Sequence, residues 1–175
     1  MRRGFLVALA ALLVGPALAL AGPQAAPGVS HGQPVGFPPC VAGTYLGEVT
    51  LVQEPPLTFR NLSSFGVDGT FVTEATIDFG AGGTTPMAFR SGGHGQWWMI
   101  GPHKLKVTYL HFAYDGVGNL LWLEKISAVQ TFSHGCSSAT GEATYAIYPP
   151  DRDPFEDEPV AGGTATLVMK RLPRN

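Results

Sequence analysis

The sequence predicts an all-β protein that folds as an eight-stranded antiparallel up-and-down barrel, similar to a lipocalin. From Gly43 to Leu172, eight short segments have the alternating pattern of half-buried strands, and none has helical periodicity. The connections alternate between tight turns and loose loops, which is typical of a barrel that is closed at one end and open at the other. A β-sandwich with Greek-key crossings is the main alternative.

The expected strands, in chain order, cover residues 44–52, 58–65, 70–79, 96–100, 104–114, 120–132, 138–148 and 164–172. Asp68-Gly69 is a strong hairpin signal before the third segment, and Pro102 ends the fourth. Tight turns are therefore expected at residues 67–69, 101–103 and 133–135. In an up-and-down barrel these three turns lie at one end, and the loose connections 53–57, 80–95, 115–119 and 149–163 lie at the other.

The N-terminus has the organisation of a signal peptide. Arg2-Arg3 precedes the apolar run Phe5 to Val14, and Ala19-Leu20-Ala21 forms a small-residue cleavage site. We expect a signal peptide over 1–21, a flexible Pro/Gly-rich leader over 22–39 and a single barrel domain over 40–175. The protein is then secreted or periplasmic, by the Sec route rather than by twin-arginine export.

Cys40 and Cys136 are the only cysteines, and in an exported chain such a pair predicts a disulfide. In the barrel topology both lie at the closed end, so the bond needs no rearrangement. The net charge of −2 and the low charged fraction of 14% argue against a nucleic-acid partner. After the signal peptide no segment is long and apolar enough for a membrane span.

Charged residues indicate which side chains face the barrel interior, because the strands of a small barrel alternate between lumen and solvent. Lys104 and Lys106 face solvent, so Tyr109 and His111 face inward. The same argument applied to the first, third, fifth and seventh segments gives an interior that mixes small residues (Gly47, Ala75, Ala113, Gly141, Ala143) with large ones (Phe71, Phe79, Tyr109, Tyr145). This mixture predicts either a ligand cavity or a solid core, and the two remain equal alternatives.

The sixth segment, 120–132, carries Glu124 and Lys125 side by side, so charge does not indicate its inward face.

Gly43-Thr44-Tyr45 opens the first segment, and Lys170-Arg171 lies on the last. This arrangement resembles the calycin superfamily (lipocalins, fatty-acid-binding proteins and avidins), with Tyr45 in place of tryptophan. The middle lipocalin motif and the terminal helix of that family are not evident. The resemblance implies a barrel in which a basic side chain of the last strand packs over the aromatic ring of the first.

These observations predict a protein that binds a small apolar ligand through the open end of the barrel. The expected ligand contacts are Phe71, Phe79, Trp97, Trp98, Tyr109, His111 and Tyr145. Two alternatives remain: a barrel cyclase similar to allene oxide cyclases, with His111 and Tyr109 as catalytic groups, and a non-catalytic protein-interaction module. No cofactor is expected.

Gly92-Gly93-His94-Gly95, followed by Trp97-Trp98, is interpreted as a mobile lid at the open end, or as a tight entry into the next strand. His94, His103 and His111 have no recognised metal-ligand spacing, so no metal is expected. The acidic residues of 151–158 are interpreted as a solvated, mobile loop.

Overall fold

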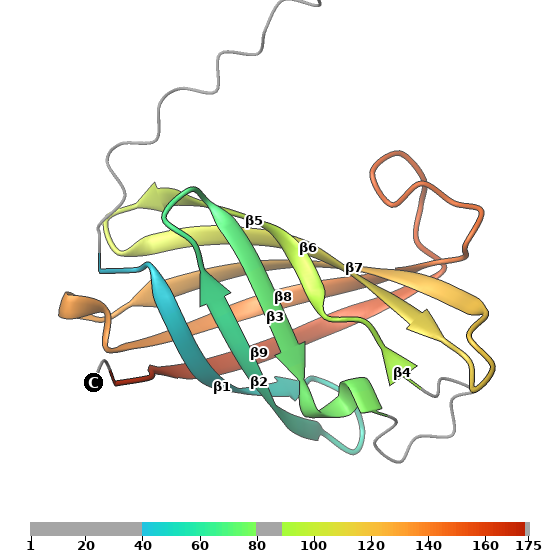
Figure 1. Cartoon of the computed structure of the whole chain (residues 1–175), viewed down its shortest axis with the longest axis horizontal. Helices are drawn as coiled ribbons and strands as arrows, with labels where there is room; N and C mark the ends of the chain where they lie inside the picture. The colour runs from blue at the N-terminus through green and yellow to red at the C-terminus, as the bar shows by residue number, and fades with distance from the viewer. Residues whose placement is uncertain (1–39, 80–88, 174–175) are drawn as a thin grey trace, which may run out of the picture. The chain divides into compact units, whose positions relative to one another are not determined.

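The structure is a computed structural model that describes residues 40–79 and 89–173. It is a closed barrel of eight strands (Figure 1): β1 (Gly43–Leu51), β2 (Leu57–Phe65), β3 (Thr70–Ala75), β5 (Gly93–Gly101), β6 (Lys104–Tyr114), β7 (Leu120–Phe132), β8 (Ser138–Tyr148) and β9 (Ala161–Arg171). The predicted signal peptide and leader lie outside the described residues.

Every barrel strand pairs antiparallel with its neighbours in the sequence, and the pairing of β1 with β9 closes the sheet. The two-residue strand β4 (Phe89–Arg90) pairs with β6 beyond the end of β5. This order confirms the predicted up-and-down barrel and contradicts the Greek-key alternative.

The helical turns of the described residues are η1 (Thr76–Phe79) and η2 (His134–Cys136). No helix in the described ranges has the length and apolarity that crossing a bilayer requires.

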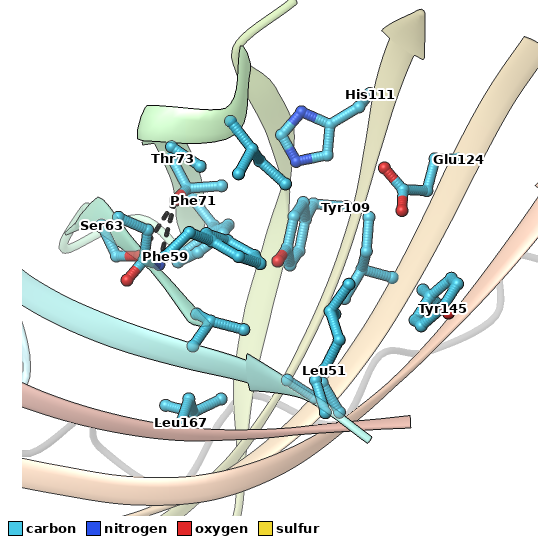
Figure 2. Close-up of a pocket in the computed structure, with 18 of the residues that line it drawn as sticks. Leu51, Phe59, Ser63, Phe71, Thr73, Tyr109, His111, Glu124, Tyr145 and Leu167 are labelled. Carbon is cyan, nitrogen blue, oxygen red and sulfur yellow. Dashed lines mark hydrogen bonds between the residues drawn. The ribbon is translucent and has the colours of Figure 1, made fainter. Parts of the chain in front are cut away.

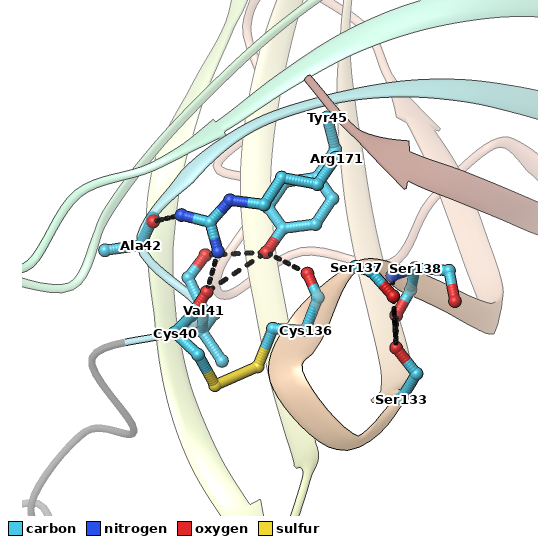
Figure 3. Close-up of a disulfide and its surroundings, with 9 residues drawn as sticks. All are labelled: Cys40, Val41, Ala42, Tyr45, Ser133, Cys136, Ser137, Ser138 and Arg171. Atoms are coloured by element: carbon cyan, nitrogen blue, oxygen red, sulfur yellow. Dashed lines mark hydrogen bonds between the residues drawn. A yellow bond between two sulfur atoms is a disulfide. The ribbon is translucent and has the colours of Figure 1, made fainter. Parts of the chain in front are cut away.

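The closed end is joined by the disulfide between Cys40 and Cys136, whose Cα atoms are 5.5 Å apart (Figure 3). Cys40 precedes β1 and Cys136 follows β7, so the bond joins strands that are not neighbours in the sheet. The predicted disulfide is confirmed. The turns that follow β2, β5 and β7 lie at this same end, as the alternation of connections predicts.

The closed half of the barrel is filled by a solid core. Its buried side chains include Tyr45, Phe65, Phe71, Trp97, Leu105, Val107, Phe132 and Met169. The rings of Tyr45, Trp97 and Phe132 each meet Phe65 edge-on, with centroids 5.5 to 5.9 Å apart. Such edge-to-face contacts are the favoured geometry for aromatic rings in a dense core.

The predicted strand ends need correction at three places. The segment 70–79 leaves the sheet after Ala75 and turns into η1, because β2 pairs with β3 only as far as Ala75. Thr76 Oγ1 then lies within hydrogen-bond distance of the amide and carbonyl of Arg60. The fourth strand begins at Gly93 rather than at residue 96, and the last begins at Ala161 rather than at residue 164.

Glycines in β5 mark a close approach of strands rather than a loop. A Cβ at Gly95 would lie 2.0 Å from the carbonyl oxygen of Thr108 and 2.5 Å from Cα of Tyr109. A Cβ at Gly93 would lie 2.7 Å from the ring of His111. The interpretation of 92–95 as a lid is therefore wrong, since Gly93 and Gly95 are needed where the backbone of β5 packs on β6.

The acidic connection between β8 and β9 is held against the outer wall of the barrel. Pro154 is buried, and its carbonyl accepts a hydrogen bond from Lys125 Nζ. The same ammonium lies 5.3 Å from the ring centroid of Tyr148 and 5.6 Å from that of Phe155. Tyr148 is consequently only 3% exposed. The acidic side chains of 151–158 are mostly exposed, as expected, but the contacts of Lys125 attach the connection to β7 and β8.

Candidate ligand-binding cavity

The open half of the barrel contains a cavity (Figure 2). Its lining comes from every barrel strand except β5, together with Ile77 of η1 and Arg90 of β4. The volume available to the centre of a water molecule is about 70 Å³, which is room for a few waters. The barrel is thus solid at its closed end and hollow at its open end.

Small side chains leave this space open. Ala75, Ala128, Ala143 and Ala165 line the cavity, each from a different strand. Larger apolar groups complete the wall, with Phe71, Ile126 and Leu167 among them. The mixture of small and large inward residues therefore produces both predicted outcomes, each in a different half of the barrel.

An ion pair crosses β6 on the cavity side. A guanidinium nitrogen of Arg90 contacts Glu124 Oε2, and the two side chains are only 9% and 13% exposed. Arg90 is paired in register with Ala113, and Glu124 with His111. The small, fully buried Ala113 lets the long side chain of Arg90 reach across the strand. We call this contact the Arg90–Glu124 pair.

His111 lies beside this pair and is 2% exposed. Its Nδ1 is 2.8 Å from the carbonyl oxygen of Ser91. Since a carbonyl can only accept, Nδ1 carries the hydrogen, and the backbone of the β4–β5 connection orients the ring. The ring of Tyr109 meets His111 at 5.3 Å in an edge-on contact, and Phe71 packs on Tyr109 at 5.0 Å.

A second polar cluster lines the opposite side of the cavity. Asn61 Nδ2 donates to Ser63 Oγ at 2.9 Å and to Thr73 Oγ1 at 3.4 Å, and the two hydroxyls are 3.1 Å apart. Asn61 Oδ1 is buried against Gly47, where a Cβ would lie 2.1 Å away. Among the described residues this oxygen has no hydrogen-bond partner. The cluster makes the cavity wall more polar than the sequence predicted.

The structure brings four of the predicted ligand contacts together around the cavity: Phe71, Tyr109, His111 and Tyr145. Trp97 lies in the solid core instead, where its Nε1 donates to the carbonyl of Gly66 at 3.0 Å. Trp98 lies on the outer face, 39% exposed, with Lys106 Nζ 5.8 Å from its ring centroid. The side chain of Phe79 is outside the described part of the structure.

His94 is exposed on the outer face of β5 and does not approach the cavity. His103 lies at the closed end, where its ring is 4.7 Å from that of His134. The histidines at 94, 103 and 111 are therefore separate. In the described part of the chain, no three side chains of the metal-ligating types gather into a site.

Sequence reasoning missed both members of the Arg90–Glu124 pair. Glu124 faces inward and Lys125 outward, but Leu121, Leu123 and Val129 are as apolar as Ile126, Ala128 and Phe132. Alternation along β7 therefore favours neither face. Arg90 is 34 residues from its partner, and no local pattern connects the two.

Comparison with known proteins adds no assignment: no family model, curated protein or solved structure matches this chain. The interpretation of the cavity therefore depends on its own geometry.

Proposed function

We propose that this protein binds a small molecule in the cavity at the open end of its barrel. The observation that carries this proposal is the contrast between the two halves of the lumen. The closed half is packed with aromatic and aliphatic side chains, whereas alanines at inward positions of four strands keep the open half hollow. Protein interiors are close-packed by default, so such a space at a barrel mouth is typical of a binding site.

The cavity dimensions limit the ligand. The cavity volume of about 70 Å³ is about half that of a 150 Å³ cavity that holds benzene. The enclosed part of the ligand is therefore a short apolar chain or one edge of an aromatic ring, and the rest of the ligand extends through the open mouth. Phe71, Tyr109, Ile126 and Leu167 offer the apolar contacts for such a group. Displacing cavity water from these surfaces supplies the free energy of binding, at about 25 cal/mol for each Å² of apolar surface buried.

The proposal also covers the cellular location of the protein and the superfamily to which it belongs. A disulfide fits an oxidising compartment, which agrees with the signal peptide expected over 1–21, so we place the protein outside the cytoplasm. Membership of the calycin superfamily is supported by the barrel and by the packing of Arg171 over the Tyr45 ring, 5.6 Å from guanidinium carbon to centroid. Sequencing the N-terminus of the mature protein tests its location. Identifying a bound ligand tests the relationship to the calycin superfamily.

The direct test is native mass spectrometry of protein purified from its own host, together with calorimetric titration by 1-hexanol and phenol. Ala143→Phe fills the cavity and is expected to abolish binding. Ala146→Phe is the matched control, because Ala146 lies on the outer face of the same strand. The proposal fails if neither compound binds and no small molecule copurifies, or if both variants bind equally well.

A further inference from the structure

The Arg90–Glu124 pair places one charge of each sign on the wall of the cavity. Both side chains are about nine-tenths buried, and both line the space proposed to hold the ligand. Two opposite charges removed from water depend on each other, because an isolated buried charge is strongly disfavoured. A ligand that separated the two groups would have to replace the interaction it broke.

The remaining lining residues add no lysine, arginine, aspartate or glutamate to the cavity. A carboxylate at the mouth would gain from Arg90 but would face the like charge of Glu124. An ammonium group would gain from Glu124 but would face Arg90. Either ion would also lose its hydration on entering a space this small, so neither sign is favoured.

An uncharged hydrogen-bonding group is repelled by neither Arg90 nor Glu124. Figure 2 shows the Glu124 carboxylate directed into the space between His111, Tyr109 and Tyr145. A carboxylate accepts hydrogen bonds, whereas a phenolic hydroxyl both donates and accepts them. A hydroxyl or amide on the ligand matches this mixture of groups without disturbing the ion pair.

We infer that the ligand is an uncharged amphipathic molecule, with an apolar body that enters the cavity and a hydroxyl or amide head group beside the Arg90–Glu124 pair. The inference rests on the proposed function and goes further, because it assigns head-group selection to these two residues. The apolar body lies against Phe71, Ile126 and Leu167, and the pair excludes carboxylates and amines.

The test compares three probes of equal chain length: 1-hexanol, hexanoate and hexylamine, titrated at pH 7 by calorimetry. The wild-type protein is expected to bind 1-hexanol about tenfold more tightly than either ion. Glu124→Gln removes the negative charge beside Arg90, so this variant should bind hexanoate about tenfold more tightly than the wild type does. Arg90→Gln should gain affinity for hexylamine instead, by a similar factor.

Two further measurements protect the test against misfolding. Far-UV circular dichroism identifies a variant that has lost the barrel, and a destabilised Glu124→Gln should show a rise in melting temperature with hexanoate but not with hexylamine. The double variant Arg90→Gln with Glu124→Gln removes both charges and should favour neither ion.

Head-group selection is overturned if the wild type binds the three probes equally, or if neither single variant changes its preference. Binding without discrimination overturns only this inference. The absence of any binding to the wild type, by these probes and by phenol, with no copurifying small molecule, overturns the proposed function as well.

Discussion

The guanidinium of Arg171, on the last strand, covers the ring of Tyr45, on the first (Figure 3). It also donates to the carbonyl oxygens of Cys40 and Ala42. Tyr45 is fully buried, and its hydroxyl lies 3.1 Å from the carbonyl oxygens of both Val41 and Cys136. These two side chains therefore join three segments at the closed end: the lead into β1, the end of β9 and the turn after β7.

Arg171→Met should lower the free energy of unfolding by about 2–3 kcal/mol, since two carbonyls lose a charged donor and the ring loses its cation. Lys170→Met is the matched control, because Lys170 is exposed and its loss should cost less than about 0.5 kcal/mol. Urea unfolding followed by circular dichroism measures both. Equal losses in the two variants would contradict a sealing role for Arg171.

Replacing both cysteines with alanine should lower the free energy of unfolding by about 2–5 kcal/mol. The bond joins residues separated by 96 positions, so its removal releases a long loop in the unfolded chain. Wild-type protein unfolded in the presence of a reductant should match the double variant. Binding of 1-hexanol by the folded double variant should be unchanged, because the disulfide lies at the end of the barrel opposite the cavity.

Gly95→Ala should destabilise the barrel by about 1–3 kcal/mol through overpacking, because the new methyl group would meet the backbone of β6. Gly101→Ala is the control in the same strand. There the nearest contact of a Cβ is Lys104 Cβ at 3.8 Å, an ordinary van der Waals distance. Thermal unfolding of the two variants should differ by several degrees, and identical melting temperatures would argue against the close approach of β5 and β6.

Lys125→Met should release the connection between β8 and β9 from the outer wall. The variant loses the hydrogen bond to Pro154 and the contacts with two rings, so amides of residues 149–160 should exchange hydrogen faster. Lys106→Met, which removes a comparable contact with Trp98, should leave this exchange unchanged. Unaltered protection in Lys125→Met would show that other contacts hold the connection.

Acid should weaken the hairpin between β2 and β3. The Thr70 hydroxyl and amide donate to Asp68 and hold the pKa of its carboxyl below the ordinary value of 3.8. A carboxyl whose pKa is lower in the folded state stabilises the fold above its unfolded pKa, and this contribution is lost as pH falls through the folded value. Asp68→Asn should therefore be less stable than the wild type at pH 6, with the difference shrinking below pH 3.8; a difference independent of pH would contradict this assignment.

Residues of the candidate site could be predicted where the charged residues of a single strand indicate which of its faces is outward. Lys104 and Lys106 indicate the outward face of β6, which places Tyr109 and His111 in the lumen. The prediction that Trp97 and Trp98 contact the ligand is wrong, because the glycines before them resemble a loop. In the structure Gly93 and Gly95 are strand residues, and alternation then directs Trp97 inward and Trp98 outward.

The sequence by itself determined the all-β class, the order of the strands, the closed end and the cysteine pair. Strand alternation and turn residues are local properties of the chain, and they are sufficient for an up-and-down topology in which neighbours in sequence pair in space. The tertiary structure alone decided which half of the lumen is hollow and that Glu124 turns inward to meet Arg90. Those outcomes depend on volumes and charges contributed by strands far apart in the sequence, and no local pattern contains them.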